Sequence, residues 1–194
     1  MSDPLVTLFT AAIGRFADRV DAVDDEQWSD PTPCEDWDVR ALVNHLCSEQ
    51  RWAPHLLAGE TMEQVGDRYD GDLLGLDPKT TFHDAMAGSV AAFERAASQG
   101  KGLDGIVHLS FGDVPCRVYL SQMLTDAEVH GWDLARALGR PAQLDDAVVE
   151  LVLPEMQAQE QLIRSSGVFG PAVEIPADAS DADRLLAILG RDPR

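Results

Sequence analysis

Apolar residues recur at intervals of three and four along most of this chain, and this spacing restricts the fold more than any other feature. Between residues 4 and 23 the apolar positions are Leu5, Leu8, Phe9, Ala12, Ile13, Phe16, Val20 and Val23. Residues spaced in this way form one face of an α-helix, and that face must be buried against another element. The same reasoning predicts further helices over 39–58, 80–98, 118–138, 145–163 and 181–189.

Segments rich in proline, glycine and aspartate separate these helices. The proline-rich stretch 30–38 is too poor in free amides for a helix, and it ends at Asp38, a good N-cap. Residues 59–78 are predicted to form a long loop. Segments 106–111 and 114–118 predict either a two-stranded ribbon or a loop before the fourth helix, and 173–176 a short extended piece. Four or five amphipathic helices with one long crossover loop are typical of an all-α helical bundle.

The charge of the chain excludes several classes of function. There are 34 acidic and 15 basic side chains among 194 residues, for a net charge of -19. Such a chain is repelled by nucleic acid and by anionic lipid. No apolar run approaches the roughly 20 residues of a membrane span, and the first residues lack the basic and apolar regions of an export signal. With three widely spaced cysteines and no disulfide framework, we expect a cytoplasmic protein.

Asp126 and His130 are the first residues whose spacing indicates chemistry. Four positions apart on a predicted helix, they lie on one face, about 5–6 Å apart at Cβ, and can share one cation. An ordinary ion pair between them at the bundle surface is the alternative, and spacing alone favours it. His45 borders the apolar face of the second helix. If it faces Asp126 and His130, the three form a two-histidine, one-carboxylate set with open coordination positions, as in catalytic metal sites.

The remaining histidines, cysteines and tryptophans give weaker signals. His55, His83 and His108 are interpreted as surface or loop residues. Cys47 is predicted to be a small core residue and Cys34 to pack in a turn. Trp37 and Trp132 are predicted to pack at the ends of the bundle rather than to form a binding platform. The glycines form no phosphate-binding loop or dinucleotide-binding motif.

Two long motifs resemble a known family. Residues 32–46 read TPCEDWDVRALVNHL and residues 126–139 read DAEVHGWDLARALG. These segments resemble the two motifs of the metal-binding domain of mycothiol-dependent maleylpyruvate isomerases, in the DinB-like superfamily of four-helix bundles. The chain looks closest to a largely uncharacterised actinobacterial subgroup. The resemblance implies an up-down bundle over residues 1–140 and a short helical extension over 141–194 that packs on it as part of one domain.

The resemblance also implies a metal site and a reaction class. The metal ligands of the family correspond to His45, Asp126 and His130, with an aspartate here where the isomerase has a glutamate. Zinc is the expected ion, with nickel, manganese and iron as alternatives, and mycothiol is the implied cosubstrate. The implied activity is a thiol S-transferase or thiol-assisted isomerase acting on a small electrophile. Arg51 and Trp52, one to two turns beyond His45, are candidates for substrate contact.

Two other functions remain open at this point. One is a non-enzymatic metal-binding or stress-response protein, and the other is a hydrolase that uses a metal-bound hydroxide. Turnover that requires a thiol distinguishes the thiol enzyme from both. We expect small molecules as partners, no nucleic acid or membrane, and a homodimer as the assembly to test.

Overall fold

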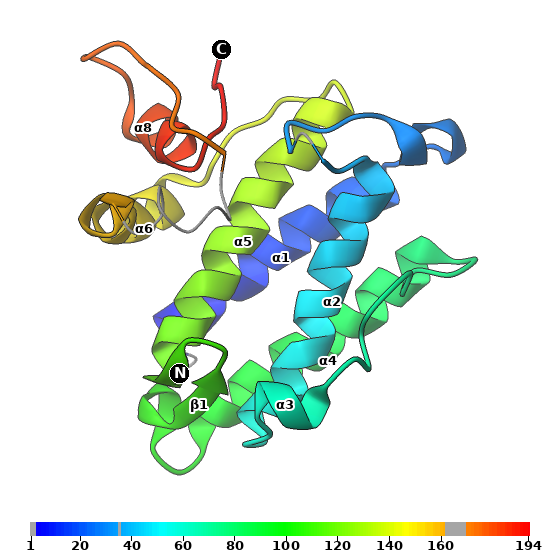
Figure 1. Cartoon of the computed structure of the whole chain (residues 1–194), viewed down its shortest axis with the longest axis vertical. Helices are drawn as coiled ribbons and strands as arrows, with labels where there is room; N and C mark the ends of the chain where they lie inside the picture. Colours follow the sequence, from blue (N-terminus) through cyan, green and yellow to red (C-terminus); the bar gives the residue numbers. More distant parts are fainter. Residues whose placement is uncertain (1–2, 35, 162–169) are drawn as a thin grey trace. The chain divides into compact units, whose positions relative to one another are not determined.

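The helices of the N-terminal part build one four-helix bundle. A computed structural model describes residues 3–34, 36–161 and 170–194, and these fall into two compact units that divide after Arg140. In the first unit the bundle consists of α1 (Pro4–Asp21), α2 (Val39–Leu57), α4 (Pro78–Ser98) and α5 (Cys116–Ala137). Helix α1 packs on α4 and α5, and α2 also packs on α4 and α5 (Figure 1). The predicted helical bundle is therefore confirmed.

The apolar stripes of the four helices meet in one core. Phenylalanines from different helices form its centre, with ring centroids 5.2 Å apart for Phe9 and Phe93 and 5.0 Å apart for Phe16 and Phe82. Around them lie fully buried leucines, Leu42, Leu46, Leu56, Leu120, Leu124 and Leu134. Burial of such side chains contributes about 1.5–3 kcal/mol each, so the core rather than any polar contact dominates the stability of the bundle.

Aspartate side chains cap three of the bundle helices. The carboxylates of Asp3, Asp38 and Asp77 accept hydrogen bonds from backbone amides in the first turns of α1, α2 and α4. An amide at a helix start has no partner within the helix, and replacement of such a cap by alanine costs about 1 kcal/mol. The predicted N-cap at Asp38 is confirmed, and it sets where α2 begins and hence where His45 lies.

The connections of the bundle are more structured than predicted. The 3₁₀ helix η1 (Asp25–Ser29) follows α1, and the single-turn helix α3 (Met62–Val65) interrupts the predicted loop. The latter forms because Thr61 and Gln64 make a capping box. After α4 come the 3₁₀ helix η2 (Gly102–Asp104) and the ribbon β1 (Ile106–Leu109) and β2 (Gly112–Pro115), paired antiparallel. The ribbon alternative is confirmed, and α5 begins directly after it.

The second unit, residues 141–194, contains two described helices that pack on each other. These are α6 (Asp146–Ala158), with Pro154 inside it, and α8 (Asp181–Ile188). The prediction of a helix up to residue 163 reaches beyond the observed end of α6, and residues 162–163 lie outside the described residues. Residues 173–176 form no strand, although the Val173 amide donates to the Ala187 carbonyl. That the extension packs on the bundle stays a prediction.

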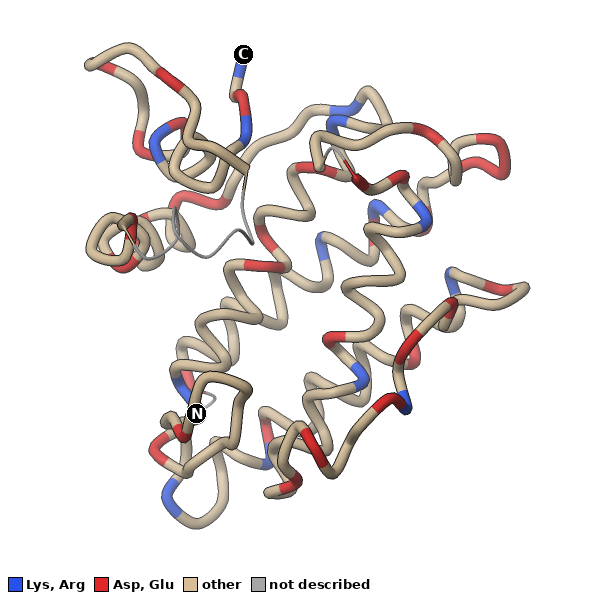
Figure 2. Tube along the Cα trace, in the orientation of Figure 1, with Lys and Arg blue, Asp and Glu red and all other residues tan. Residues whose placement is uncertain are grey.

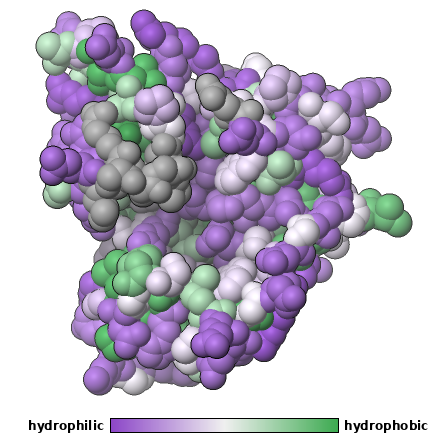
Figure 3. Space-filling model, in the orientation of Figure 1, coloured by the Kyte–Doolittle hydropathy of each residue, from purple (hydrophilic) through white to green (hydrophobic). Residues whose placement is uncertain are grey.

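Acidic side chains are spread over both units. Figure 2 shows Asp and Glu outnumbering Lys and Arg along the whole trace. The face drawn in Figure 3 is mostly hydrophilic, with apolar side chains in small groups. None of the described helices has the length and apolar character needed to cross a membrane. A surface of this charge repels polyanions, in agreement with the expectation from composition.

Candidate metal centre

Helices α2 and α5 bring together the three residues that the motifs nominated. His45 Nε2 lies 3.2 Å from Asp126 Oδ2, and His130 Nε2 lies 3.2 Å from Asp126 Oδ1. One nitrogen of each histidine and a carboxylate oxygen all lie within 4.8 Å of one another. The two imidazole rings meet edge to face, with centroids 5.3 Å apart. The carboxylate therefore sits between two histidines from different helices.

One carboxylate oxygen of this cluster lacks a hydrogen bond. Asp126 Oδ2 is buried and has no hydrogen-bond partner in the structure, because His45 Nε2 approaches it without hydrogen-bond geometry. A buried anionic oxygen without a donor is costly, and a cation placed between the three side chains would satisfy it. Two imidazole nitrogens and a carboxylate are a donor set that suits zinc and other first-row metals. The residues present therefore fit the implied metal.

Burial and charge shift the pKa values of the cluster in opposite directions. At Asp126, burial favours the neutral acid, but attraction to His130 and the close approach of both histidines outweigh it and hold the pKa well below its usual value. At His130, burial favours the neutral ring, but Asp126, Asp133 and Cys34 raise the pKa well above its usual value. Without a metal, a positive imidazolium thus faces the carboxylate.

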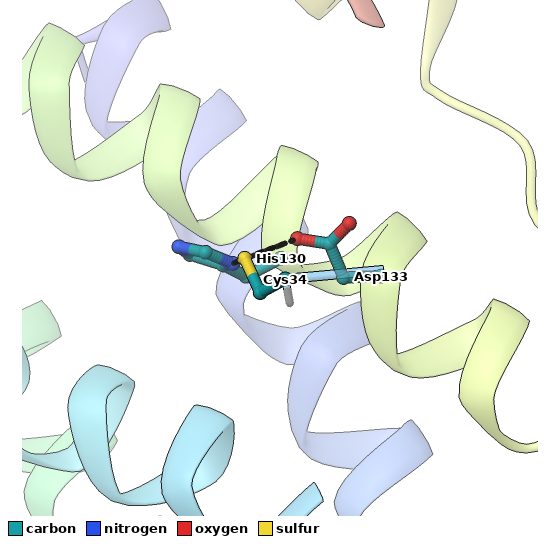
Figure 4. Close-up of side chains that lie close together, drawn as sticks. All are labelled: Cys34, His130 and Asp133. Carbon is teal, nitrogen blue, oxygen red and sulfur yellow. Dashed lines mark hydrogen bonds and ion pairs between the residues drawn. The ribbon is translucent and has the colours of Figure 1, made fainter. Parts of the chain in front are cut away.

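A second carboxylate, that of Asp133, contacts His130 at the ring nitrogen opposite the one that faces Asp126. Asp133 is fully buried on α5, and its Oδ2 lies 2.9 Å from His130 Nδ1 (Figure 4). When Nδ1 donates this hydrogen bond in the neutral ring, the lone pair of Nε2 points toward Asp126 and His45. Cys34 reaches the same atoms, with its sulfur 3.6 Å from Asp133 Oδ2 and 4.0 Å from His130 Nδ1. Cys34 therefore does more than pack in a turn.

Trp37 lies against the histidines, which corrects the prediction that it packs at the end of the bundle. Its ring centroid is 4.6 Å from that of His45 and 5.4 Å from that of His130. The indole thus packs against both imidazoles. The available signal was its place in the first motif, one residue before the Asp38 cap. Trp132 is buried, with the Arg136 guanidinium 5.3 Å from its ring, in agreement with a packing role.

The weaker substrate-contact candidates lie further along α2. The charge of Arg51 opposes the rise that burial causes in the pKa of the Cys47 thiol, so Arg51 lies near Cys47, which is a buried core residue as predicted. Trp52 packs against Tyr69, with ring centroids 6.5 Å apart. The structure thus places Arg51 and Trp52 beside side chains other than the two histidines and Asp126. Their contact with substrate stays a prediction.

The other three histidines pair with carboxylates away from this cluster. His55 Nδ1 lies 2.8 Å from Glu60, His83 Nε2 lies 3.0 Å from Asp21, and His108 Nδ1 lies 2.7 Å from Asp113. All six side chains are more than a quarter exposed. His55 and His83 stand on helices rather than loops, but the interpretation of these histidines as surface residues agrees with their exposure.

Sequence reasoning missed two residues that border the cluster. Glu49 follows His45 by four residues on α2, and Tyr119 precedes Asp126 by seven residues on α5. Both intervals place the side chains on the same helix face as the predicted ligands. This spacing was visible in the sequence, but it carried no weight until α2 and α5 were known to face each other.

Comparison with known proteins places the chain in a family. The model of the mycothiol maleylpyruvate isomerase N-terminal domain matches residues 9–135. The chain belongs to this family. Two uncharacterized proteins of Mycobacterium tuberculosis, MT0763 and Rv0738, are 31% identical to it over 201 residues, covering 99% of this chain and all of each relative. The resemblance drawn from the two motifs is thereby confirmed.

Solved structures show that the fold is shared. Crystal structures of the mycothiol-dependent maleylpyruvate isomerase and of one of its mutants each match with a TM-score of 0.66 and 17% sequence identity. The match covers 88% of this chain and 75% of that protein. The prediction of a DinB-like helical bundle with a small ribbon agrees with this likeness.

Proposed function

We propose that this protein is a metal-dependent enzyme that uses a low-molecular-weight thiol, as a thiol-assisted isomerase or an S-transferase. The observation that carries the proposal is the convergence of His45, Asp126 and His130 around a buried oxygen without a hydrogen bond. These three residues would hold one divalent ion, zinc first, with nickel, manganese and iron as alternatives. Mycothiol is the thiol that the family description supports.

The residues around the site have distinct tasks in this proposal. A divalent ion bound there would lower the pKa of a coordinated thiol, so that the thiol reacts as thiolate at neutral pH. Asp133 keeps His130 in one orientation through its bond to Nδ1. Trp37 packs against both imidazoles and helps to hold the two rings in place. The free thiols of Cys34, Cys47 and Cys116 favour a reducing compartment, and we infer the cytoplasm.

The test compares thiol addition by metal-loaded protein, metal-free protein and the Asp126→Ala variant. Mycothiol and other small thiols are offered with maleylpyruvate or a simple Michael acceptor. We expect the loaded protein to give the largest acceleration around pH 6.5–7.5, where a free thiol with a pKa near 8.5 is mostly protonated.

Three outcomes separate this proposal from the alternatives. Turnover only with thiol supports the thiol enzyme. Turnover of an ester or amide without thiol replaces it with the metal hydrolase. Tight metal binding with no acceleration by any thiol replaces it with the non-enzymatic metal-binding protein.

A further inference from the structure

In and beside the candidate metal centre lie polar groups that make no hydrogen bond in the described part of the chain. The hydroxyl of Tyr119 is buried and makes no hydrogen bond, although the residue is only 4% exposed. Asp126 Oδ2 is in the same condition two helical turns further along α5. Buried polar atoms are nearly always satisfied, and exceptions concentrate where a ligand or reaction supplies the partner.

Glu49 is another of these groups. Its carboxylate is half-buried on the face of α2 that carries His45, and none of the observed hydrogen bonds or ion pairs of the described residues involves it. Burial, followed by repulsion from Asp126, raises the pKa of Glu49, whereas attraction to His45 and His130 opposes this rise. The carboxylate therefore lies within electrostatic reach of all three predicted ligands.

The hydroxyl of Tyr119 lies in the electrostatic field of Glu49 and Asp126. Burial, followed by the negative charges of Glu49, Cys116 and Asp126, raises the pKa of Tyr119 well above its usual value. A phenol in this environment stays protonated and can only donate or accept a hydrogen bond. Its ring packs on Phe93, with centroids 5.6 Å apart, which holds the hydroxyl in place. Glu49 on α2 and Tyr119 on α5 thus offer an acceptor and a rigid donor from two helices that pack on each other (Figure 1).

We propose that Glu49 is the proton acceptor for the thiol and that Tyr119 is the hydrogen-bond donor to the carbonyl oxygen of an α,β-unsaturated substrate. The inference rests on the proposed function and adds two catalytic residues to it. Glu49 does not join the group of ligand atoms that lie within 4.8 Å of one another, so its place is beside the metal rather than on it.

The step balances with these two residues. The S–H proton moves to the Glu49 carboxylate when the thiol binds, and the sulfur of the resulting thiolate then forms a bond to the β-carbon of the substrate. The π electrons of the double bond move to the carbonyl oxygen, and the resulting enolate accepts the hydrogen bond of Tyr119. The former double bond is now single and rotates. When the C–S bond breaks, the electron pair returns to sulfur, the double bond reforms in the trans geometry, and Glu49 returns the proton to the thiolate.

A transferase outcome needs no further group. Glu49 then delivers its proton to the α-carbon of the enolate, and sulfur stays on the product as a thioether. Both routes require a substrate with a carbonyl group conjugated to the double bond, because only then can Tyr119 stabilise the charge that develops. An unactivated alkene or a simple alkyl halide offers no oxygen at that place.

The test of Glu49 counts protons on thiol binding. Mycothiol is titrated into zinc-loaded protein at pH 7 in buffers of different ionisation enthalpy, and the slope of the binding heat gives the protons released. We expect close to none for the natural protein, because Glu49 keeps the proton, and about one for Glu49→Gln. Glu60→Gln, a half-exposed carboxylate beside His55, is the matched control and should behave like the natural protein.

The test of Tyr119 uses Tyr119→Phe, with Tyr69→Phe as the control because the hydroxyl of Tyr69 already bonds to His55. Loss of a preorganised oxyanion donor lowers kcat by about 10²–10³-fold, and loss of a general base lowers it by about 10²–10⁴-fold. We expect reductions of this order for Tyr119→Phe and Glu49→Gln on maleylpyruvate, with zinc content and helical signal unchanged. The two control variants should keep the natural rate.

The outcomes separate this inference from the function on which it rests. If the loaded natural protein binds no thiol, the proposed function fails and the inference fails with it. If thiol binds but proton release is the same in the natural protein and Glu49→Gln, or Tyr119→Phe retains full kcat, only the inference is overturned. A loss of zinc in Glu49→Gln overturns it in favour of Glu49 as a metal ligand.

Discussion

Two groups of side chains, each built around a histidine of α2, contain carboxylates and a tyrosine. They differ in whether all of their buried polar atoms have hydrogen-bond partners. The first, which we name the His45 group, consists of His45, Glu49, Tyr119, Asp126 and His130. The second, the His55 group, consists of His55, Glu60, Arg68 and Tyr69. In the His55 group the histidine is bonded on both ring nitrogens, with Nδ1 2.8 Å from Glu60 and Nε2 2.7 Å from the Tyr69 hydroxyl.

The two groups also differ in how deeply some of their side chains are buried. Arg68 adds an ion pair to Glu60 at 3.1 Å, and the side chains of the His55 group are 28–47% exposed where they form ion pairs. In the His45 group Tyr119 and His130 are 4% and 7% exposed, the side chains of His45 and Asp126 are 28% and 29% exposed, and two buried oxygens have no hydrogen bond. Similar residue types thus form a hydrogen-bonded surface network in one place and, in the other, a partly buried cluster with two oxygens that lack hydrogen bonds.

This contrast indicates that the His45 group, and not the His55 group, is the ligand-binding site. A water-exposed network ties the 60–69 segment to α2 and has nothing left to bind. A cluster whose buried oxygens lack hydrogen bonds carries a desolvation cost that a bound ligand would offset. The two groups contain similar residue types and start from the same helix. They are distinguished by the hydrogen bonds of their polar atoms and by the burial of some of their side chains.

The largest effect is expected from removal of a histidine from the His45 group. His130→Ala leaves one histidine and one carboxylate, and zinc affinity should fall by more than about 100-fold, beyond the loss typical of residues that only support ligands. The helical circular dichroism should persist, because the leucines and phenylalanines carry the core. Metal analysis after equilibrium dialysis measures the loss, with His55→Ala as the control. Full zinc occupancy in His130→Ala would reject the assignment.

The next effect is the pH dependence of metal binding. Because the pKa of His130 is raised in the metal-free protein, a metal must displace a proton there, and affinity should fall about tenfold per pH unit below that pKa. With a small excess of zinc, occupancy should be lost below roughly pH 6. Metal titrations between pH 5.5 and 8 test this expectation, and an affinity that stays constant across that range contradicts it.

The same pKa shifts predict an opposite trend for the stability of the metal-free protein. The raised pKa of His130 adds stability that is fully present below pH 6.5 and is lost as pH rises through the folded-state value. The lowered pKa of Asp126 adds stability that is present above about pH 3.9 and is lost on acidification below it. Urea unfolding of metal-free protein should therefore show this contribution largest between about pH 4 and 6.5. The contribution should be smaller in Asp126→Asn, where only Asp133 and Cys34 still raise the pKa of His130.

A smaller effect is expected from the residue that holds His130 in place. Asp133→Asn keeps the size of the side chain but weakens the bond to Nδ1, and zinc affinity should fall about 10–100-fold. Isothermal titration with zinc measures the change. Glu60→Gln, which alters the corresponding partner of His55, should leave the affinity where it was. Equal affinities of Asp133→Asn and the natural protein would show that Asp133 serves packing alone.

The smallest effect is expected from the His55 group itself. His55→Ala breaks its bonds to Glu60 and Tyr69, but these side chains are exposed enough for water to replace the lost contacts. The free energy of unfolding should change by no more than about 1 kcal/mol, as for other surface ion pairs. Urea denaturation measures it. A loss of zinc binding in this variant would remove the distinction between the two groups.

Several parts of the fold and of the site were accessible from the sequence. The three-and-four spacing of apolar residues predicted the four bundle helices, because a helix can bury only a stripe of that period. The interval between Asp126 and His130 placed them on one face, and the two motifs nominated His45 as their partner. The single turn α3 was missed, because its capping box lies in a stretch whose glycines and aspartates indicate a loop.

Only the tertiary structure decided which of many polar residues belong together. No local period indicates that Trp37 packs against His45, or that Glu49 on α2 and Tyr119 on α5 both lie in the electrostatic field of Asp126. His55 carries as good a local signal as His45, yet it lies in a satisfied surface network. Local spacing sets the face on which a side chain lies, whereas burial and hydrogen bonding depend on what the neighbouring helix places opposite that face.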